Sequence, residues 1–329
     1  MTAARTWDFA AELARHPAAD HPGGVTAEEA RAYCRWMAGV HYENFPVLSI
    51  AVPKPLRQDF ANVYAYCRWS DDLGDETGGG RRALELLEAW ELELRRAYEG
   101  KARHPITIAL AETIRRFEIP PTPFVDLLDA FRRDQTQKTY ATYAELLDYC
   151  RCSANPVGQL VLYLAGRHRP ENAADSDAIC TGLQLANFWQ DLARDAAIGR
   201  IYLPAEDRER FGVPEADVLA GRDSPQLREL VRFECERAEG LLRSGLPLAR
   251  RMPGRLRLAI ALFANGGLGI LRAIKRAGYG SMARRPKLGK SSYLGIGARA
   301  VFASIFPVGG KRQAGAGGSQ EPSPLAFRG

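Results

Sequence analysis

The sequence predicts an all-α protein, a single-domain helical bundle around a central apolar cavity. Apolar residues recur at helical spacing along most of the 329 residues, and the alternation typical of strands is almost absent. Two acid-rich segments, residues 70–76 and 184–195, each place carboxylates one helical turn apart. No internal repeat divides the chain, so one helical domain is expected.

Caps and breakers define the predicted helices. Residues 26–29 are typical of a capped helix start and lead into the first helix, and the Pro-containing residues 41–55 form a connection to the second. Three glycines at 78–80 separate the second from the third, and Asn155-Pro156 breaks the chain before a later helix. The predicted helices are Ala30–Gly39, Leu56–Leu73, Arg81–Tyr98, Pro105–Phe117, Pro123–Thr136, Tyr143–Cys150, Gly158–Arg167, Ala174–Ala196, Gln226–Ser244 and Arg255–Ala277.

Composition divides the chain into three parts. Residues 1–24 are predicted to be an N-terminal extension, and residues 25–308 the helical domain. From residue 309 the composition shifts to Gly, Ser, Gln and Pro, so residues 309–329 are predicted to be a disordered tail.

Charge and cysteine usage exclude several classes of protein. The net charge of +6 is spread among acids without a basic stripe, so no nucleic-acid partner is expected. The N-terminus lacks the apolar core of a secretory signal, and no run approaches ~20 uninterrupted apolar residues. The six cysteines lack zinc-site spacing and fit buried thiols in a reducing compartment. A cytoplasmic protein is therefore predicted.

The acids of both segments form stripes on their helices. Tyr64, Arg68, Asp71 and Asp75 fall at i, i+4, i+7 and i+11, and the neighbouring faces are mainly apolar. The second segment repeats this pattern with Gln184, Asn187, Asp191 and Asp195. Like charges one turn apart repel, and buried carboxylates are costly unless they are paired or bind a metal. We therefore expect both stripes to face an internal cavity that holds cations; a solvated face with local salt bridges is the alternative.

The residue types favour Mg²⁺ with a diphosphate. Carboxylates, an amide and a nearby arginine suit Mg²⁺ and phosphate oxygens. Zinc would require His or Cys, and a di-iron bundle would require Glu-x-x-His motifs. There is also no phosphate-binding Walker loop and no dinucleotide fingerprint, because Gly266 to Gly269 follow no strand. Metal-assisted departure of a diphosphate fits best, and NADPH is not expected.

These segments resemble the signatures of the squalene/phytoene synthase family, all-α isoprenoid synthases. Residues 64–76 are similar to its first aspartate-rich signature, and residues 185–204 are similar to its second. The resemblance extends through Tyr149-Cys150 and weakly to Arg285-Pro286, and covers roughly residues 25–295. It implies an isoprenoid-synthase-type bundle and several Mg²⁺ ions, about two or three, that bridge both acid sets to diphosphate.

Three segments favour one subgroup of this family. Residues 43–47, 153–158 and 187–191 resemble the hydroxysqualene synthases of hopanoid biosynthesis. Condensing relatives usually carry small hydroxyls and a cation where this chain has Glu43-Asn44-Phe45. The departure agrees with presqualene diphosphate, a substrate with one diphosphate. A condensing prenyltransferase that makes presqualene diphosphate or phytoene, and an inactive isoprenoid-binding scaffold, are the alternatives.

The resemblance assigns roles to individual residues. The expected metal ligands are Asp71, Asp72, Asp75, Glu76, Asn187, Asp191 and Asp195. The expected catalytic residues are Asp71, Asp75, Asp191, Asp195 and Tyr64. Substrate binding is expected of Arg68, Asn44, Phe45, Gln184, Phe188, Arg200, Tyr202 and Asn155. Gln184 and Asn155 are the candidates for positioning the capturing water, and a salt bridge to Asp71 is the alternative role of Arg68.

Two expectations concern partners. The neighbouring enzymes of the squalene pathway are expected to contact the protein transiently. Because the product is very apolar, peripheral contact with the inner membrane surface is also expected through residues 295–308; a last core helix is the alternative.

Overall fold

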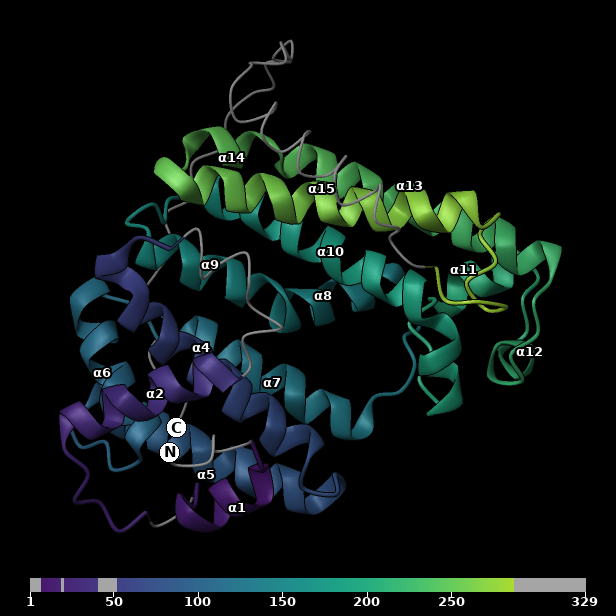
Figure 1. Ribbon diagram of the computed structural model, residues 1–329. Coiled ribbons are helices and arrows are strands. Elements are labelled where there is room, and N and C mark those ends of the chain that lie inside the picture. Colours follow the sequence, from purple (N-terminus) through teal and green to yellow (C-terminus); the bar gives the residue numbers. More distant parts are fainter. Residues whose placement is uncertain (1–6, 19–20, 41–51, 287–329) are drawn as a thin grey trace, which may run out of the picture.

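The computed structural model of the protein describes residues 7–18, 21–40 and 52–286. These residues form helices joined by short connections (Figure 1), and within them no β-strand occurs. A single isolated parallel bridge joins Thr139 and Ile201 in this part of the chain. The all-α prediction is confirmed.

The helices follow one another with short loops. In chain order they are α1 (Phe9–Arg15), α2 (Ala27–Val40), η2 (Lys54–Leu56), α4 (Arg57–Asp75), α5 (Gly80–Tyr98), α6 (Pro105–Phe117), α7 (Thr122–Thr136), α8 (Tyr143–Ser153), α9 (Asn155–Leu164), α10 (Pro170–Ala197), α11 (Ala205–Arg210), α12 (Glu215–Leu219), α13 (Pro225–Gly245), α14 (Pro247–Arg251) and α15 (Gly254–Arg276).

The ten predicted helices are all present, and within the described residues four short α-helices and the 3₁₀ helix η2 were not predicted. The break at residues 154–155 is shorter than expected: α9 begins at Asn155, with Pro156 in its first turn, where a proline costs no hydrogen bond. Pro170 starts α10 four residues earlier than predicted for the same reason. Helices α1, α11, α12 and α14 have five to seven residues each, too few to show a helical period in the sequence.

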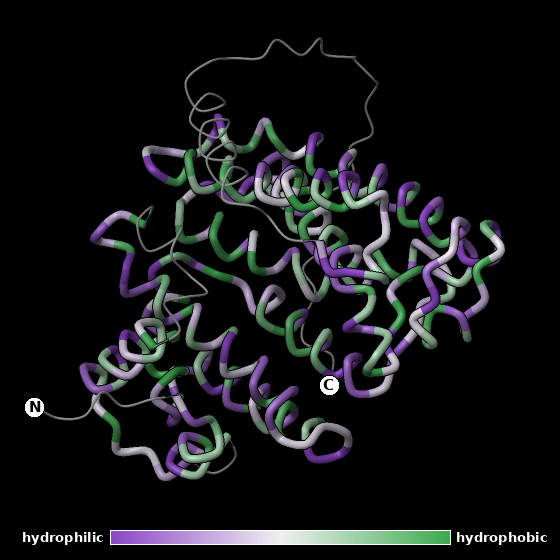
Figure 2. Tube along the Cα trace, turned by 45° about the vertical axis from the view of Figure 1, so that its right-hand side comes forward, coloured by the Kyte–Doolittle hydropathy of each residue, from purple (hydrophilic) through white to green (hydrophobic). Residues whose placement is uncertain are grey.

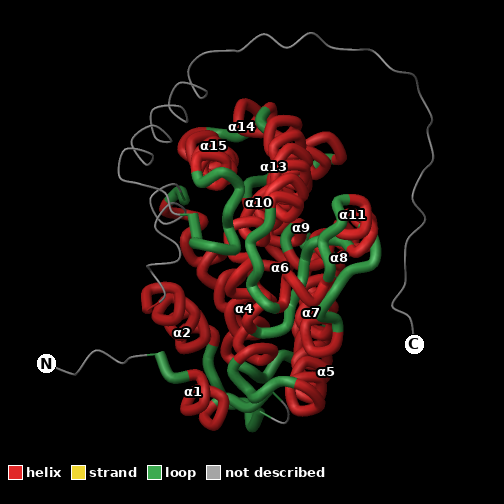
Figure 3. The backbone as a smooth tube through the Cα atoms, turned by 90° about the vertical axis from the view of Figure 1, so that its right-hand side faces the viewer, coloured by secondary structure: helices red, strands yellow, loops and turns green. Residues whose placement is uncertain are grey.

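Helix α10 lies between the two halves of the molecule. It packs against α13 and α15 on one side and against α9 on the other, while α4 contacts α2, α5, α6 and α7 (Figures 1 and 3). The buried apolar residues form two large clusters, one around α4 and one around α10 and α13, and Leu183 borders both. Apolar and polar residues alternate along the helices in Figure 2, as expected when one face of each packs in the core.

Glycines allow the closest helix approach. A Cβ at Gly245, at the end of α13, would lie 2.5 Å from the carbonyl oxygen of Asp175 on α10. At Gly182 a Cβ would lie 2.7 Å from Leu242 Cγ. Contacts this short are repulsive, so the spacing of α10 and α13 depends on the absence of side chains at these positions.

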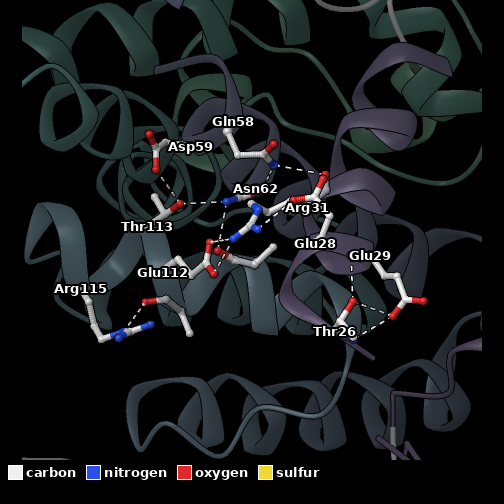
Figure 4. A network of polar contacts seen from close by, with 12 residues as sticks. Thr26, Glu28, Glu29, Arg31, Gln58, Asp59, Asn62, Glu112, Thr113 and Arg115 are labelled. Atoms are coloured by element: carbon white, nitrogen blue, oxygen red, sulfur yellow. Dashed lines mark hydrogen bonds and ion pairs between the residues drawn. The ribbon is translucent and has the colours of Figure 1, made fainter. Parts of the chain in front are cut away.

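A polar network joins α2, α4 and α6 (Figure 4). Asn62 donates from Nδ2 to Thr113 Oγ1 over 3.0 Å and accepts from Gln58 Nε2 over 2.7 Å, and Arg31 donates to both carboxylate oxygens of Glu112. Asn62 is buried, so the amide is satisfied inside the core rather than by water. The network connects α4 to α2 and α6.

The N-terminal extension is packed onto the domain. Phe9 is buried in the cluster around α4, and its ring meets Trp69 edge-on at 5.1 Å. Asp8 caps α1 by accepting from the N–H of Ala11. Residues 7–18 therefore pack against α4, the helix that carries the first acid segment. The predicted tail, residues 309–329, lies outside the described residues.

Helix α15 is long and apolar enough to cross a bilayer, since an 18-residue window of it has a mean hydropathy of 1.4. More than half of that window, 56%, is buried inside the protein. It packs against α10, α13 and α14, which is the behaviour of a core helix.

Three histidines join the extension to the domain. Gly23 N–H donates to His21 Nδ1 over 3.1 Å, and His21 Nε2 lies 3.0 Å from His16 Nδ1. His104 accepts from the N–H of Ile106 at the start of α6 and packs its ring against both. Burial lowers the pKa of His21 despite the charge of Glu93, and burial together with the other two rings lowers the pKa of His104 well below its usual value.

We expect acid to destabilise this histidine cluster. The unfolded chain takes up protons below about pH 6.5, whereas the folded cluster binds them only at lower pH. The contribution of the histidine cluster to the unfolding free energy is complete above that pH. It is lost as the pH falls, by about 1.4 kcal/mol per pH unit for each histidine that is protonated only in the unfolded chain. His104→Asn keeps a capping side chain and should reduce the fall in unfolding free energy between about pH 7.5 and 5.5. Equal pH slopes for the variant and the native protein would contradict this.

Candidate active site

The first acid segment ends α4. The Asp71 side chain is 41% exposed, and Asp75 is exposed. Burial and the neighbouring charge of Asp75 raise the pKa of Asp71 to about 6. Tyr64, two turns earlier on the same stripe, is half-buried, and burial raises its pKa to about 12. Among the described residues, Asp71 and Asp75 therefore lie at a rim that is accessible to solvent, and the predicted internal cavity for this stripe stays a prediction.

Two predicted ligands of this segment lie apart from the stripe. Asp72 is fully buried and forms an ion pair with Arg68. Glu76 caps the helix end and lines a separate groove beside α1 and α5. Arg68 also lies 3.5 Å from Asp71, so it makes the salt bridge considered as its alternative role. Asp71 and Asp75 are therefore the carboxylates that the first segment presents at the rim.

The second acid segment lies near the end of α10. Asn187 is exposed, and Asp191 and Asp195 are partly buried. Burial and the charge of Asp191 raise the pKa of Asp195 to about 6. Arg285 donates to both carboxylate oxygens of Asp191, from Nη2 to Oδ2 over 3.0 Å and from Nε to Oδ1. The amide of Gln190 donates to the Pro286 carbonyl over 2.7 Å and fixes this connection against α10.

The positive charge of Arg200 interacts with acids of both segments. Burial opposes its charge, but the charges of Asp134 and Asp75 contribute to a pKa above its usual value. The same guanidinium favours ionised Asp195. Backbone hydrogen bonds from Ile201 to Lys138 and from Ala205 to Tyr140 join the connection after α10 to the one after α7. The charge of Arg200 thus interacts with carboxylates that are 120 residues apart, Asp75 and Asp195.

Asp134 and Tyr149 are site residues that the sequence reasoning missed. Tyr149 donates from its hydroxyl to Asp134 Oδ1 over 2.8 Å, and burial raises the pKa of both groups. Asp134 also opposes ionisation of Asp71. Tyr149 could have been found, because it lies in a segment that resembles the family. Asp134 is one of several acids in α7, and nothing in the sequence distinguishes it from the others.

Aromatic rings form the wall next to these charges. Phe188 stacks on Tyr202 with ring centroids 3.7 Å apart and an interplanar angle of 6°. Tyr202 in turn packs against Tyr140 and Tyr149. Phe188 and Tyr202 are therefore buried beside the acid segments, with their faces mostly covered by one another, and their role in substrate binding stays a prediction.

An apolar pocket of about 270 Å³ opens beside the second stripe. It lies between α9, α10 and α15, and Gln184 is both part of its wall and the first residue of the α10 stripe. Asn155 does not line it: the side chain is buried and accepts from Thr181 Oγ1 over 2.9 Å. Asn44, Phe45 and residues 295–308 lie outside the described residues.

The donor types fit Mg²⁺, although no three of the described His, Cys, Asp or Glu side chains converge on one point. Mg²⁺ in proteins is usually held by one or two carboxylates plus substrate phosphates, so a preformed protein cage is not required. Burial and a neighbouring carboxylate raise the pKa of both Asp71 and Asp195, and a nearby cation would favour their ionised forms. A cation bound with a diphosphate would act in this way.

The whole arrangement suits an amphipathic substrate, with an anionic head at the acid rim and a hydrocarbon in the apolar pocket. A model of the squalene/phytoene synthase family matches residues 23–292, which include both acid segments and the pocket.

The chain belongs to the squalene/phytoene synthase family.

Three family members illustrate its range of products. The structure is similar to that of squalene synthase HpnC from Alicyclobacillus acidocaldarius, with a TM-score of 0.74 and 45% identity over 77% of this chain and 95% of that one. A phytoene synthase from Thermus thermophilus is 34% identical over 81% of this chain and 91% of its own length. A hydroxysqualene synthase from Rhodopseudomonas palustris is 35% identical over 63% and 70%, respectively. As a member of the squalene/phytoene synthase family, the protein is an isoprenoid synthase that acts on prenyl diphosphates.

Proposed function

We propose that this squalene/phytoene synthase is a hydroxysqualene synthase. It would convert presqualene diphosphate and water into hydroxysqualene and diphosphate in squalene and hopanoid biosynthesis. The observation that carries the proposal is the 35% identity to a hydroxysqualene synthase over 70% of that protein's length. The Glu43-Asn44-Phe45 segment supports it, because it lacks the cation expected for a second diphosphate.

The polar site residues would bind the diphosphate of the substrate, and the apolar pocket would bind its hydrocarbon part. Asp71, Asp75, Asn187, Asp191 and Asp195 would hold Mg²⁺, which when bound offsets the negative charge of the leaving diphosphate. Arg200 and Arg285 supply fixed positive charge at the same rim. The apolar pocket shields the hydrocarbon cation from bulk water until it is captured.

A condensing prenyltransferase is the second candidate. The 34% identity to a phytoene synthase over 91% of that protein favours it, and the acid segments serve either reaction. The proposed lyase needs room for one prenyl diphosphate, whereas condensation needs two.

Substrate tests separate the candidates. The purified full chain would be incubated with presqualene, farnesyl or geranylgeranyl diphosphate, with Mg²⁺ or with a chelator, and the lipids extracted. We expect hydroxysqualene from presqualene diphosphate with Mg²⁺ and no product after chelation. Phytoene, or presqualene diphosphate formed from farnesyl diphosphate, would establish the condensing activity instead. Absence of diphosphate release from all three would favour the inactive scaffold.

Location and partners remain predictions of the sequence. We propose a cytoplasmic enzyme that passes its apolar product to the inner membrane surface and contacts neighbouring pathway enzymes transiently. Flotation with anionic vesicles, with and without residues 287–329, would test the membrane contact.

A further inference from the structure

The Arg68 side chain on α4 lies next to two carboxylates of the first acid segment. It donates a hydrogen bond from Nη2 to Asp72 Oδ1. Its Nη1 lies 3.5 Å from Asp71 Oδ2, which is an ion-pair distance but too long for an ordinary hydrogen bond. Asp71 and Asp72 follow Arg68 by three and four residues, so the same side chain can reach either of them along the helix. Of these two carboxylates, Asp72 is the one that holds the guanidinium closely.

Burial explains why Arg68 pairs with Asp72. The Asp72 side chain is 1% exposed, whereas that of Asp71 is 41% exposed. Opposite charges attract weakly in water and more strongly inside a protein, so the buried carboxylate attracts the guanidinium more than the exposed one does. A buried carboxylate is also costly without a partner, which keeps Arg68 in place. The covered position of Asp72 therefore suits a partner of Arg68 better than a ligand at the rim.

Without Asp72, Arg68 would compete with a metal ion for Asp71. Asp71 is already within ion-pair distance, and a guanidinium readily binds both oxygens of a carboxylate. The second acid segment contains such a pair, because Arg285 donates to both carboxylate oxygens of Asp191. A cation that needs the same oxygens would first have to displace the arginine.

We propose that Asp72 is a positioning residue that holds Arg68 away from Asp71 and so keeps the Asp71 carboxylate available to Mg²⁺. This inference rests on the Mg²⁺ site of the proposed function but not on its product, because the condensing reaction would use the same site. Asp72 acts through its charge and its place one turn after Arg68, without touching the metal ion. The Arg68 side chain remains 26% exposed, so its outer part stays accessible to a diphosphate.

Metal binding by four forms of the full chain tests this role. They are the native protein, Asp72→Asn, Arg68→Gln and the double variant. Mn²⁺, which prefers the same oxygen ligands as Mg²⁺, would be titrated without substrate, and the free ion measured by electron paramagnetic resonance. In Asp72→Asn, Arg68 pairs with Asp71, so the dissociation constant of Mn²⁺ should rise by about fivefold, the effect of one partly exposed ion pair. Asp72→Ala, which also removes the acceptor, should raise it at least as much.

The Arg68→Gln substitution separates this role from a simple sum of charges. In the native background Asp72 already holds Arg68, so Arg68→Gln should change the dissociation constant by less than about twofold. In the Asp72→Asn background the same substitution removes the competitor and should lower the constant by about fivefold, back to the native value.

Asp59→Asn is the matched control. Asp59 is a buried carboxylate of the same helix and pairs with Arg116 over 2.7 Å. It lies about 18 Å before Asp71 along the helix axis, at ~1.5 Å per residue. Its replacement should leave the dissociation constant within about 1.5-fold of native. Circular dichroism would show that each variant is folded.

Several results would overturn the role assigned to Asp72. The Mn²⁺ constant of Asp72→Asn could equal that of the native protein or of Asp59→Asn. A loss that Arg68→Gln does not reverse would make Asp72 itself a ligand, and equal effects of Arg68→Gln in both backgrounds would mean that the charges only add. Absence of saturable Mn²⁺ binding to the native chain would also contradict it. A native enzyme that forms phytoene instead of hydroxysqualene would refute the proposed function and leave this inference standing.

Discussion

Replacing Asp71 with Asn is expected to lower turnover by about 10²–10³-fold, because it removes a charge that stabilises the departing diphosphate. The side chain lies at the rim, where burial and Asp75 already raise its pKa to about 6. The substitution preserves volume and relieves repulsion from Asp75, so the melting temperature should be unchanged or slightly higher. Steady-state diphosphate release and a thermal melt measure both effects.

Glu76→Gln is the matched control for this prediction. Glu76 has the same type of charge one residue beyond the helix end, but it faces the groove beside α1 and α5. Turnover should stay within about twofold of native, since surface changes away from the site are nearly neutral. A loss for Glu76→Gln as large as that for Asp71→Asn would show that the structure places the first metal set wrongly.

Replacing Glu93 with Ala is expected to cost about 3–5 kcal/mol of unfolding free energy, the largest effect on stability. Glu93 is 1% exposed, and Oε1 accepts from the N–H groups of Arg103 and His104 and from the Thr107 hydroxyl, over 2.6, 2.8 and 2.9 Å. The variant would leave the buried His104 N–H unpaired and would remove the acceptor of the Arg103 N–H, while the Thr107 hydroxyl keeps the His104 carbonyl as its other acceptor. At roughly 2–4 °C per kcal/mol for a chain of this size, the melting temperature should fall by about 10 °C.

A conservative variant and a surface variant serve as controls for the Glu93→Ala prediction. Glu93→Gln keeps an acceptor oxygen and should lose less than half as much stability. Glu88→Ala, on the exposed side of the same helix, should change the unfolding free energy by less than about 0.5 kcal/mol. If Glu93→Ala cost no more than Glu88→Ala, the buried network at the start of α6 would not exist as described.

Much of the fold was predictable because long amphipathic helices carry a strong period. The helix Pro105–Phe117 has the predicted bounds, since Pro105 starts it and Phe117 is followed by a residue in the left-handed conformation. The short helix α1 was not predictable, because its stability comes from Phe9 packing on Trp69, a contact between distant parts of the chain.

The acid stripes were predictable as helical neighbours, but their surroundings were not. Spacing alone could not show that Asp72 turns inward to Arg68 while Asp75 faces solvent, since burial depends on which helices cover each face. Asp134 reaches the site because α7 packs against α4 and α8, a tertiary arrangement that spacing along the sequence does not show. Which polar group faces the pocket also depends on tertiary packing: Ser153 lines it, and Asn155, two residues later, does not.

Isotope labelling tests the central claim most directly. Presqualene diphosphate would be converted by the purified enzyme with Mg²⁺ in water enriched in oxygen-18, and the extracted thirty-carbon product analysed by mass spectrometry. Capture of the cation by water predicts hydroxysqualene that carries one oxygen-18 atom per molecule in proportion to the enrichment. An unlabelled hydrocarbon or no conversion of this substrate, alongside formation of phytoene or presqualene diphosphate from simple prenyl diphosphates, would contradict it.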